Sequence, residues 1–259
     1  MNLTAEQIKS NWELYRSKVN ELFPTRKNQL NKMYDEFENR MALMPASSVA
    51  HYHNAFAGGY IAHVLNVMRC AELQYNMWKS AGADMSGYTF EELMFAAMHH
   101  DLGKAGFPGN GNEVYQIETS DWHRKNMGRL YKHNENIPFT MVPDLSIWLL
   151  QNYKIEMSWN EYQSIKIHDG MYDDSNKPYF VARSEKAKLK TNMAIILHHG
   201  DHMAAQIEYE RWRNHKAGTP NPVAVKSKTT KQNGLKNLAE NNPGIEQSIN
   251  DIFKSFNVD

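Results

Sequence analysis

Three capping boxes restrict the fold of this 259-residue chain more than any other feature of its sequence. In a capping box, a Ser or Thr and a Glu or Gln three residues later each accept a hydrogen bond from the other's backbone N–H at the start of a helix. The pairs with this spacing are Thr4 with Gln7, Thr89 with Glu92 and Ser158 with Glu161. Apolar residues at helical spacing follow each pair. We therefore predict helices near 4–22, 89–100 and 158–168.

Helical periodicity also dominates the rest of the chain. Apolar residues that recur at intervals of three and four predict further helices at about 25–43, 60–81, 121–132, 143–153 and 185–214. No segment shows a convincing alternating strand pattern, although 177–182 (KPYFVA) could form a short extended piece. These patterns predict an all-α fold.

Two segments do not fit this helical pattern. Residues 103–120, which include GFPGNGN, are typical of a loop. Residues 216–239 contain five lysines, no acidic residue and few large apolar residues, which is typical of a flexible linker. A short amphipathic helix is expected around 245–256. We expect residues 216–240 to be dispensable for catalysis, because they include no candidate ligand.

Composition limits the chemistry that the chain can use. Cys70 is the only cysteine, so a disulfide within the chain is excluded and a metal site must use His, Asp or Glu. Lys plus Arg and Asp plus Glu number 29 each, so overall charge gives no general attraction to nucleic acid. The apolar runs are too short for a membrane span, and the polar N-terminus differs from a secretory signal. We therefore expect a cytoplasmic location.

The stretch MHHDLGKAG (98–106) places His100 beside Asp101 where an apolar helix is expected to end. Consecutive helical side chains point about 100° apart, so the two can converge on one ion only near a helix end. Gly103 is expected to supply that end as a helix-stopping glycine. The pair indicates a metal site, a phosphate site or both.

Other elements offer further ligands, each with an ordinary structural interpretation as well. His63 and His168 lie in predicted helices, where a lone histidine is often a hydrogen-bonded core residue. His198, Asp201 and His202 share one helical face in LHHGDHM, which fits a metal cluster as well as a solvated polar face. Imidazole and carboxylate ligands suit Mn, Fe, Co, Ni, Zn or Mg.

Taken in order, these motifs resemble those of the HD-domain metal-dependent phosphohydrolase superfamily. The matching elements are HNxFxGGYIxH at 53–63, HDLGK at 100–104, HDG at 168–170 and Asp201. The resemblance covers roughly residues 45–212. It is closest to small stand-alone hydrolases of bacteria and tailed phages, and it extends to the HD domain of bacterial 3′-to-5′ exoribonucleases.

The resemblance implies an HD-type helical domain at 45–215. We expect N-terminal helices at 1–44 to pack on it, and composition predicts a flexible tail at 216–259, with a Lys-rich linker and a short helix. It also implies that one divalent metal ion is held by His63, His100, Asp101 and Asp201. Lys104 would lie beside the substrate phosphate, where an ammonium stabilises developing negative charge. Asp101 would both bind the metal and orient the attacking water.

A second metal ion is left open. His168 matches one of the additional histidines of two-metal members of the family, but Asp144 stands near the place where another histidine is expected. Either Asp144 replaces an imidazole, or one metal ion is bound and His168 contacts the substrate or acts as a general acid. We expect one tightly held ion, with His168 close to the phosphate.

Several other residues are candidates for substrate binding. His53 matches the family pattern beside the Gly58-Gly59 pair. His123, Arg124 and Lys125 form a basic cluster that either reaches for phosphates or is a solvated face, and Trp122 and Tyr131 nearby could stack on a base. Arg183 is a further cation expected to border the site.

The resemblance implies hydrolysis of phosphate esters or anhydrides by a metal-activated water. We expect a nucleotide substrate, a deoxynucleoside mono- or triphosphate. One alternative is a 3′-to-5′ exonuclease on single-stranded nucleic acid, and another is a catalytically silent nucleotide-sensing protein. The sequence does not identify the base, the sugar or the metal. It also leaves the oligomeric state open, and a homo-oligomer is possible.

Overall fold

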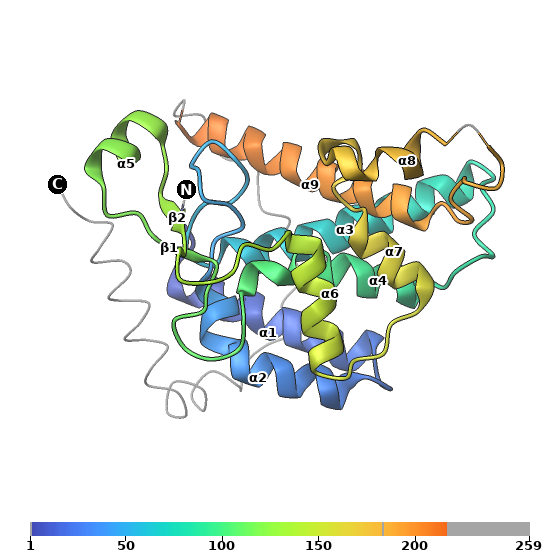
Figure 1. Ribbon diagram of the computed structural model, residues 1–259, viewed down its shortest axis with the longest axis horizontal. Coiled ribbons are helices and arrows are strands. Elements are labelled where there is room, and N and C mark those ends of the chain that lie inside the picture. Colours follow the sequence, from blue (N-terminus) through green and yellow to red (C-terminus); the bar gives the residue numbers. More distant parts are fainter. Residues whose placement is uncertain (1, 183, 217–259) are drawn as a thin grey trace.

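The computed structural model describes residues 2–182 and 184–216, and within them it confirms an all-α fold. The helices are α1 (Ala5–Leu22), α2 (Lys27–Leu43), α3 (Gly59–Ser80), α4 (Phe90–His99), α5 (Asp121–Met127), α6 (Val142–Asn152), α7 (Trp159–Lys166), α8 (Lys177–Phe180) and α9 (Met193–Lys216). Short 3-10 turns are η1 (Leu102–Ala105), η2 (Gly170–Tyr172) and η3 (Asp174–Asn176). Figure 1 shows their arrangement.

The three predicted capping boxes are present at the starts of α1, α4 and α7. In each, the Ser or Thr side chain accepts from the backbone N–H three residues on, and the Gln or Glu side chain accepts from the N-cap N–H. Because these bonds satisfy N–H groups that have no partner inside the helix, they stabilise the start locally. These helix starts therefore follow from sequence neighbours alone.

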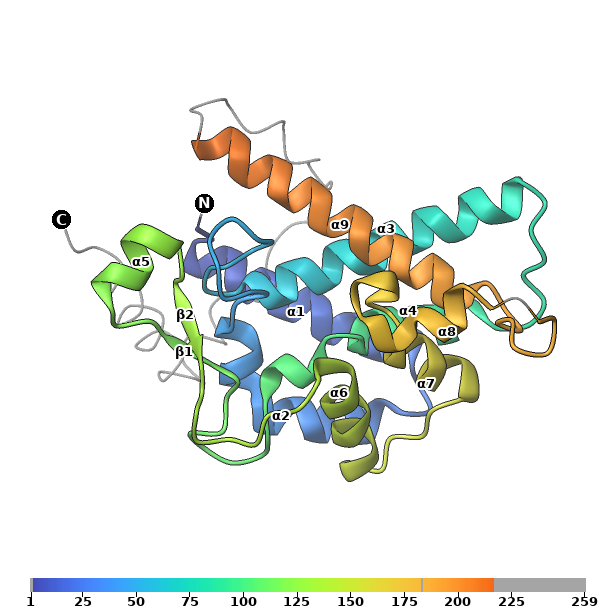
Figure 2. The same ribbon diagram turned by 45° about the horizontal axis from the view of Figure 1, so that its top comes forward.

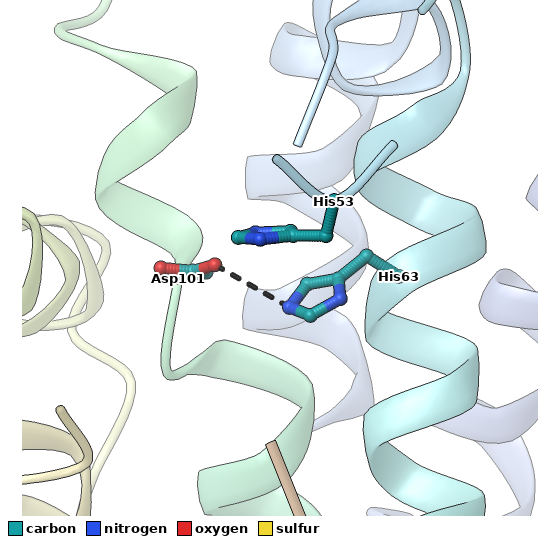
Figure 3. A group of neighbouring side chains, drawn as sticks. All are labelled: His53, His63 and Asp101. Atoms are coloured by element: carbon teal, nitrogen blue, oxygen red, sulfur yellow. Dashed lines mark ion pairs between the residues drawn. The ribbon is translucent and has the colours of Figure 1, made fainter. Parts of the chain in front are cut away.

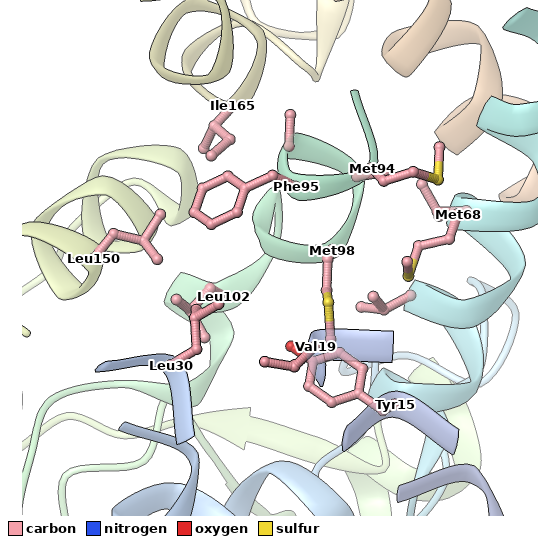
Figure 4. Close-up of a cluster of buried hydrophobic side chains, with 14 of the residues drawn as sticks. Tyr15, Val19, Leu30, Met68, Met94, Phe95, Met98, Leu102, Leu150 and Ile165 are labelled. Carbon is pink, nitrogen blue, oxygen red and sulfur yellow. The ribbon is translucent and has the colours of Figure 1, made fainter. Parts of the chain in front are cut away.

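Helix α4 forms the centre of the core. All residues from Leu93 to His99 are buried, so this helix is covered on every side. Figure 4 shows Met94, Phe95 and Met98 leaving α4 in different directions, toward apolar side chains of other helices. These neighbours include Tyr15 and Val19 of α1, Leu30 of α2, Met68 of α3, Leu150 of α6 and Ile165 of α7. The C-terminal end of α4 therefore lies inside the protein, and polar groups there need partners.

Helix α9 packs antiparallel to α3 (Figures 1 and 2). The two backbones approach closely at Gly200, where a Cβ atom would lie 2.9 Å from the backbone of Ala71. Further along, Glu208 of α9 contacts His63 of α3. The glycine in LHHGDHM thus allows the close approach that brings the next residue, Asp201, toward α3.

The middle of the chain differs from the sequence prediction. The helix expected at 121–132 ends at Met127, because Gly128 adopts a left-handed backbone conformation. The chain then forms strand β2 (Tyr131–His133), which pairs antiparallel with β1 (Tyr115–Ile117). Strand β1 lies in a segment expected to be loop. Three-residue strands are too short to show a recognisable alternation.

Two expectations near the C-terminal helix are also wrong. Helix α9 begins at Met193 rather than near 185, because the segment 184–192 carries few apolar residues and cannot bury a helix face. The expected extended piece at 177–182 is the short helix α8, whose Pro178 is compatible with a first helical turn. The linker was predicted at 216–239, and Lys216 is the last residue of α9. The rest of the predicted linker and the helix at 245–256 lie outside the described residues.

Gly103 does not end the helix as the sequence suggested. Its backbone conformation is not left-handed, and it lies within η1. A Cβ atom on Gly103 would instead lie 2.2 Å from the Val142 carbonyl oxygen of α6, and its N–H donates to Ser146 Oγ at 2.7 Å. The absence of a side chain therefore allows α6 to pack directly against the HDLGK segment.

We expect Gly103→Ala to lower the free energy of unfolding by about 1–3 kcal/mol, because the added methyl group meets backbone atoms that cannot rotate away. Chemical denaturation followed by circular dichroism measures this loss. Gly87→Ala is the matched control, since its Cβ meets only the side-chain methyl of Thr191, at 2.8 Å. Equal losses in both variants would contradict the close-packing role of Gly103.

Within residues 2–182 and 184–216, none of the helices combines the length and the apolar character needed to cross a membrane.

Candidate metal centre

His100 and Asp101 directly follow α4, where the helix gives way to η1. The last carbonyl groups of a helix have no intrahelical donor, and the ring of His100 supplies one: its Nδ1 lies 2.8 Å from the Ala97 carbonyl oxygen. His168 repeats this arrangement just after α7, with Nδ1 2.8 Å from the Ile165 carbonyl oxygen. Both helix ends therefore hold an imidazole with Nε2 facing away from the backbone.

His63 of α3 and Asp201 of α9 complete a cluster around Asp101. Figure 3 shows Asp101 at the break after α4, with a carboxylate oxygen directed toward the His63 ring and the His53 ring beside it. His63, His100 and Asp101 are buried, whereas the Asp201 side chain is 20% exposed. The structure thus brings together the four residues expected to hold a metal ion.

Four distances between an imidazole nitrogen and a carboxylate oxygen in this cluster are short enough for ligands that share an ion. The His63 Nε2 atom lies 3.2 Å from Asp201 Oδ1 and 3.8 Å from Asp101 Oδ2. The His100 Nε2 atom lies 3.4 Å from Asp101 Oδ2 and 3.8 Å from Asp201 Oδ1. Two ligands of one ion with bonds of about 2.1 Å lie at most about 4.2 Å apart. All four His–Asp separations are shorter than this limit, and the groups of side chains close enough to share an ion are His63 with His100 and Asp201, His53 with His63 and Asp101, and His100 with Asp101 and His168.

The Nε2 atoms of His63 and His100 are free to donate an electron pair to a metal ion. The Nδ1 atoms of His63 and His100 face a carboxylate and a carbonyl oxygen, which only accept, so these Nδ1 atoms carry the protons of the neutral rings. The Nε2 atoms of both rings are buried and have no hydrogen-bond partner. Buried polar atoms are rarely left unpaired, so these two fit the empty orbitals of a metal ion.

The field at the cluster is negative. Three carboxylates (Asp101, Asp201 and Glu208) face one ammonium, that of Lys104. Burial alone would lower the pKa of His63, but the carboxylates of Glu208 and Asp201 outweigh it and raise that pKa to about 10. The same excess of negative charge favours a divalent cation.

Lys104 lies one turn beyond Asp101, and its Nζ donates a hydrogen bond to Asp101 Oδ2. The side chain is 10% exposed. Burial lowers its pKa, but the Asp101 carboxylate outweighs burial and raises that pKa above the ordinary value. Lys104 therefore keeps its charge beside Asp101.

His168 and His53 lie on two flanks of the cluster. His168 Nε2 is 3.7 Å from Asp101 Oδ1, whereas His63 and His100 lie near Oδ2. The rings of His53 and His63 have centroids 4.4 Å apart, and His53 Nε2 is buried without a hydrogen-bond partner. Either histidine could join Asp101 and a neighbouring histidine in holding an ion.

The remaining expected residues lie elsewhere. Asp144 accepts a hydrogen bond from Lys166 Nζ and belongs to none of the possible metal-holding groups among the described residues. The helix that carries 123–125 is α5, which lies apart from α3, α4 and α9 in both ribbon views (Figures 1 and 2). There His123 lies 3.9 Å from Glu118, and Lys125 lies 3.8 Å from Asp121.

Arg124 is in the same helix and has no contact with the cluster among the described interactions. Arg183 lies outside the described residues. Of the three polar residues predicted to share one helical face in LHHGDHM (His198, Asp201 and His202), only Asp201 reaches the cluster. His198 Nδ1 lies 2.8 Å from the His168 carbonyl oxygen, and His202 Nδ1 lies 3.2 Å from Tyr172 Oη.

Two residues of the site were missed from the sequence. Glu208 Oε2 lies 3.0 Å from His63 Nδ1, and its Oε1 accepts from Asn66 Nδ2 at 2.7 Å. Glu208 follows Asp201 by seven residues, two helical turns, so the signal was a second acid on the same face of α9. Ser146 is the other: its Oγ accepts from the Gly103 N–H and donates to the carbonyl of His100, which holds the HDLGK turn.

Comparisons of the chain with protein-family models, with curated proteins and with solved structures find no match.

Proposed function

We propose that this protein is a metal-dependent phosphohydrolase that acts on nucleotides. The observation that carries the proposal is the pair of buried, unpartnered Nε2 atoms of His63 and His100, which face the carboxylates of Asp101 and Asp201 at ligand spacing. A divalent cation bound there would polarise a phosphoryl oxygen and lower the pKa of a water molecule. The order of the motifs, similar to HD-domain hydrolases, favours phosphate chemistry over other metal-dependent hydrolysis.

The other residues around Asp101 suit a phosphoryl group. Lys104 places an ammonium next to Asp101 Oδ2, where it can bind phosphate oxygens and stabilise charge that develops on them. His168 faces Asp101 Oδ1 on the other side and can hold a proton at Nε2, close to a leaving oxygen. Asp101 lies between these two groups, so one carboxylate can position the cation, the ammonium and the imidazole.

The arrangement of charge favours free nucleotides over strands. The basic residues of α5, which were candidates for binding phosphates, lie apart from the cluster, and two of them are near acidic side chains. Strand binding through many phosphates would weaken by roughly 0.7 log unit per contact for each log unit of salt. We expect only modest salt dependence, because Lys104 is the one lysine or arginine that contacts Asp101 among the described residues.

A substrate panel tests the proposal. The full chain, loaded in turn with Mn, Fe, Co, Ni, Zn and Mg, is incubated with nucleoside mono- and triphosphates and with short single-stranded DNA and RNA, at two salt concentrations. We expect release of phosphate or pyrophosphate from free nucleotides, loss of turnover after chelation, and its return when a divalent metal is added back.

Each alternative has its own result. Processive shortening of strands with nucleotides left intact would replace the proposal with the exonuclease. Nucleotide binding without turnover under any metal would favour the nucleotide-sensing protein. If nucleotides are neither bound nor hydrolysed, they are excluded as ligands of this protein.

A further inference from the structure

A cavity of about 370 Å³ adjoins the metal centre. Its walls come from the end of α2, from η1 and from the two-stranded β1–β2 ribbon. Lys104 belongs to this wall and also donates to Asp101 Oδ2, so one side chain borders both the cavity and the cluster. The volume lies within the range of about 300–1,000 Å³ that is usual for small-ligand sites.

The register of the ribbon explains the chemistry of the cavity wall. Tyr115 pairs with His133 and Ile117 pairs with Tyr131, and paired residues and alternate residues of a strand point to the same face. Tyr115, Ile117 and Tyr131 all line the cavity, so this face of the ribbon is turned toward it. Leu43 and Met44 add apolar surface from the end of α2. The cavity therefore offers aromatic and apolar walls next to the Lys104 ammonium.

The number of cationic side chains at the cavity limits the number of phosphate groups whose charge it can offset. Among its described lining residues, only Arg40 and Lys104 are cationic, and Glu113 adds a negative charge. Arg40 already donates to the carbonyl oxygens of Ala105, Phe107 and Gly109. Lys104 thus remains to bind substrate phosphate. One phosphate monoester carries about −1.5 to −2 charges, which an ammonium and a divalent cation can offset, whereas a triphosphate needs more.

We propose that the cavity binds the nucleoside of a nucleoside monophosphate, with the base against Tyr115 and the phosphate between Lys104 and the cluster. The assignment rests on the proposed phosphohydrolase function and narrows its substrate to one phosphate. Base–aromatic stacking tolerates all bases because each has a π-face, so the walls select a flat ring rather than one base. Asn110 and Glu113 at the cavity can bond polar groups of the sugar or the base.

The first test uses nucleosides, which contain no phosphate. Equilibrium dialysis of the chelator-treated full chain with thymidine and deoxyadenosine measures binding that depends on neither metal nor turnover. We expect Tyr115→Ala to weaken this binding by about five- to a hundredfold, the range of one stacking contact, and Tyr115→Phe to retain it. Tyr179→Ala is the matched control, because Tyr179 lines a different cavity of about 480 Å³ near α8 that contains no residue of the cluster.

The second test uses turnover of the metal-loaded chain. We expect Tyr115→Ala to raise KM for deoxynucleoside monophosphates by a similar factor, and to raise KM for glycerol phosphate, whose leaving group has no ring, much less. Nucleoside monophosphates should be better substrates than triphosphates. Ile117→Trp is a second variant, at a position 37% exposed, that fills the cavity and should block nucleosides even if Tyr115→Ala does not fold.

The outcomes separate the two proposals. Nucleoside binding that depends on Tyr115, without hydrolysis of any ester, supports the cavity and overturns the phosphohydrolase. Ester hydrolysis with nucleoside binding unaffected by Tyr115→Ala and Ile117→Trp supports the phosphohydrolase and overturns the cavity. Preference for triphosphates, or equal loss in Tyr179→Ala, also overturns the cavity assignment.

Discussion

Asp101→Asn should abolish metal binding and reduce nucleotide hydrolysis at least about 10²–10³-fold, the loss caused by removing a single electrostatic contact to a transition state. The substitution keeps the size of the side chain but removes the charge that faces His63, His100, Lys104 and His168. Burial raises the pKa of Asp101, but Lys104 and His100 outweigh it and hold that pKa well below its ordinary value. Asp101 is therefore ionised at neutral pH, as a ligand must be.

Elemental analysis of the purified variant and turnover with added metal measure these losses. Circular dichroism and thermal unfolding show whether the helices persist, because an inactive variant that is also unfolded would carry no information about the site. Asp144→Asn is the matched control: its side chain is 47% exposed and accepts from Lys166, away from the cluster. We expect its metal content and turnover to match those of the unaltered chain.

Two results would contradict this assignment. A folded Asp101→Asn protein that keeps its metal would show that the ion is bound elsewhere. Loss of one of two metal equivalents in Asp144→Asn would show that Asp144 holds a second ion, against the position that the structure gives it.

Glu208→Gln should weaken metal binding by about 10–100-fold, although Glu208 makes no contact with the proposed ion. The Glu208 carboxylate accepts from His63 Nδ1 through one oxygen and from Asn66 Nδ2 through the other. Glutamine has one acceptor oxygen, so one of the two donors would face an NH₂ group. The His63 ring would lose the partner that holds its proton at Nδ1 and leaves Nε2 free for the metal.

Titration of the chelated protein with a divalent metal measures this affinity, and saturating metal should restore most of the turnover. Glu210→Gln, two residues along the same helix and exposed, is the matched control and should have no effect. Unchanged affinity in Glu208→Gln would make the His63–Glu208 bond a packing feature only. Loss of turnover that saturating metal does not restore would place Glu208 closer to the reaction than proposed.

Local chemistry in the sequence determined the helical character of this protein. The capping boxes at Thr4, Thr89 and Ser158 use side chains three residues apart, and apolar residues at helical spacing identify the buried faces. Such signals need no partner from elsewhere in the chain. The three capping-box predictions were confirmed. Two helices predicted from apolar spacing alone, at 121–132 and 185–214, are shorter than expected, because a left-handed glycine ends the first and the polar segment before the second cannot bury a helix face.

Residue order also identified candidates for the site, but it contained no distances. His63, His100, Asp101 and Asp201 stand in three separate segments, and they meet because α4 is buried and α9 approaches α3 at Gly200. By position and type, Asp144 was a possible ligand of a second ion, and residues 123–125 of α5 were candidates for substrate binding. Only packing shows that Asp144 contacts Lys166 and that α5 lies apart from the cluster.

The tertiary structure alone decided the surroundings of the site. In the sequence, Glu208 is not distinguished from the other acidic residues. In the structure, the packing of α9 on α3 buries Glu208 beside His63. The sequence placed Tyr115 in a loop. The structure places it in β1, where the register with β2 directs Tyr115 and Tyr131 toward the cavity at Lys104. Helix formation depends on neighbours within a few residues, whereas contacts between distant segments depend on how whole elements pack, so the sequence alone determined the former and only the folded structure decided the latter.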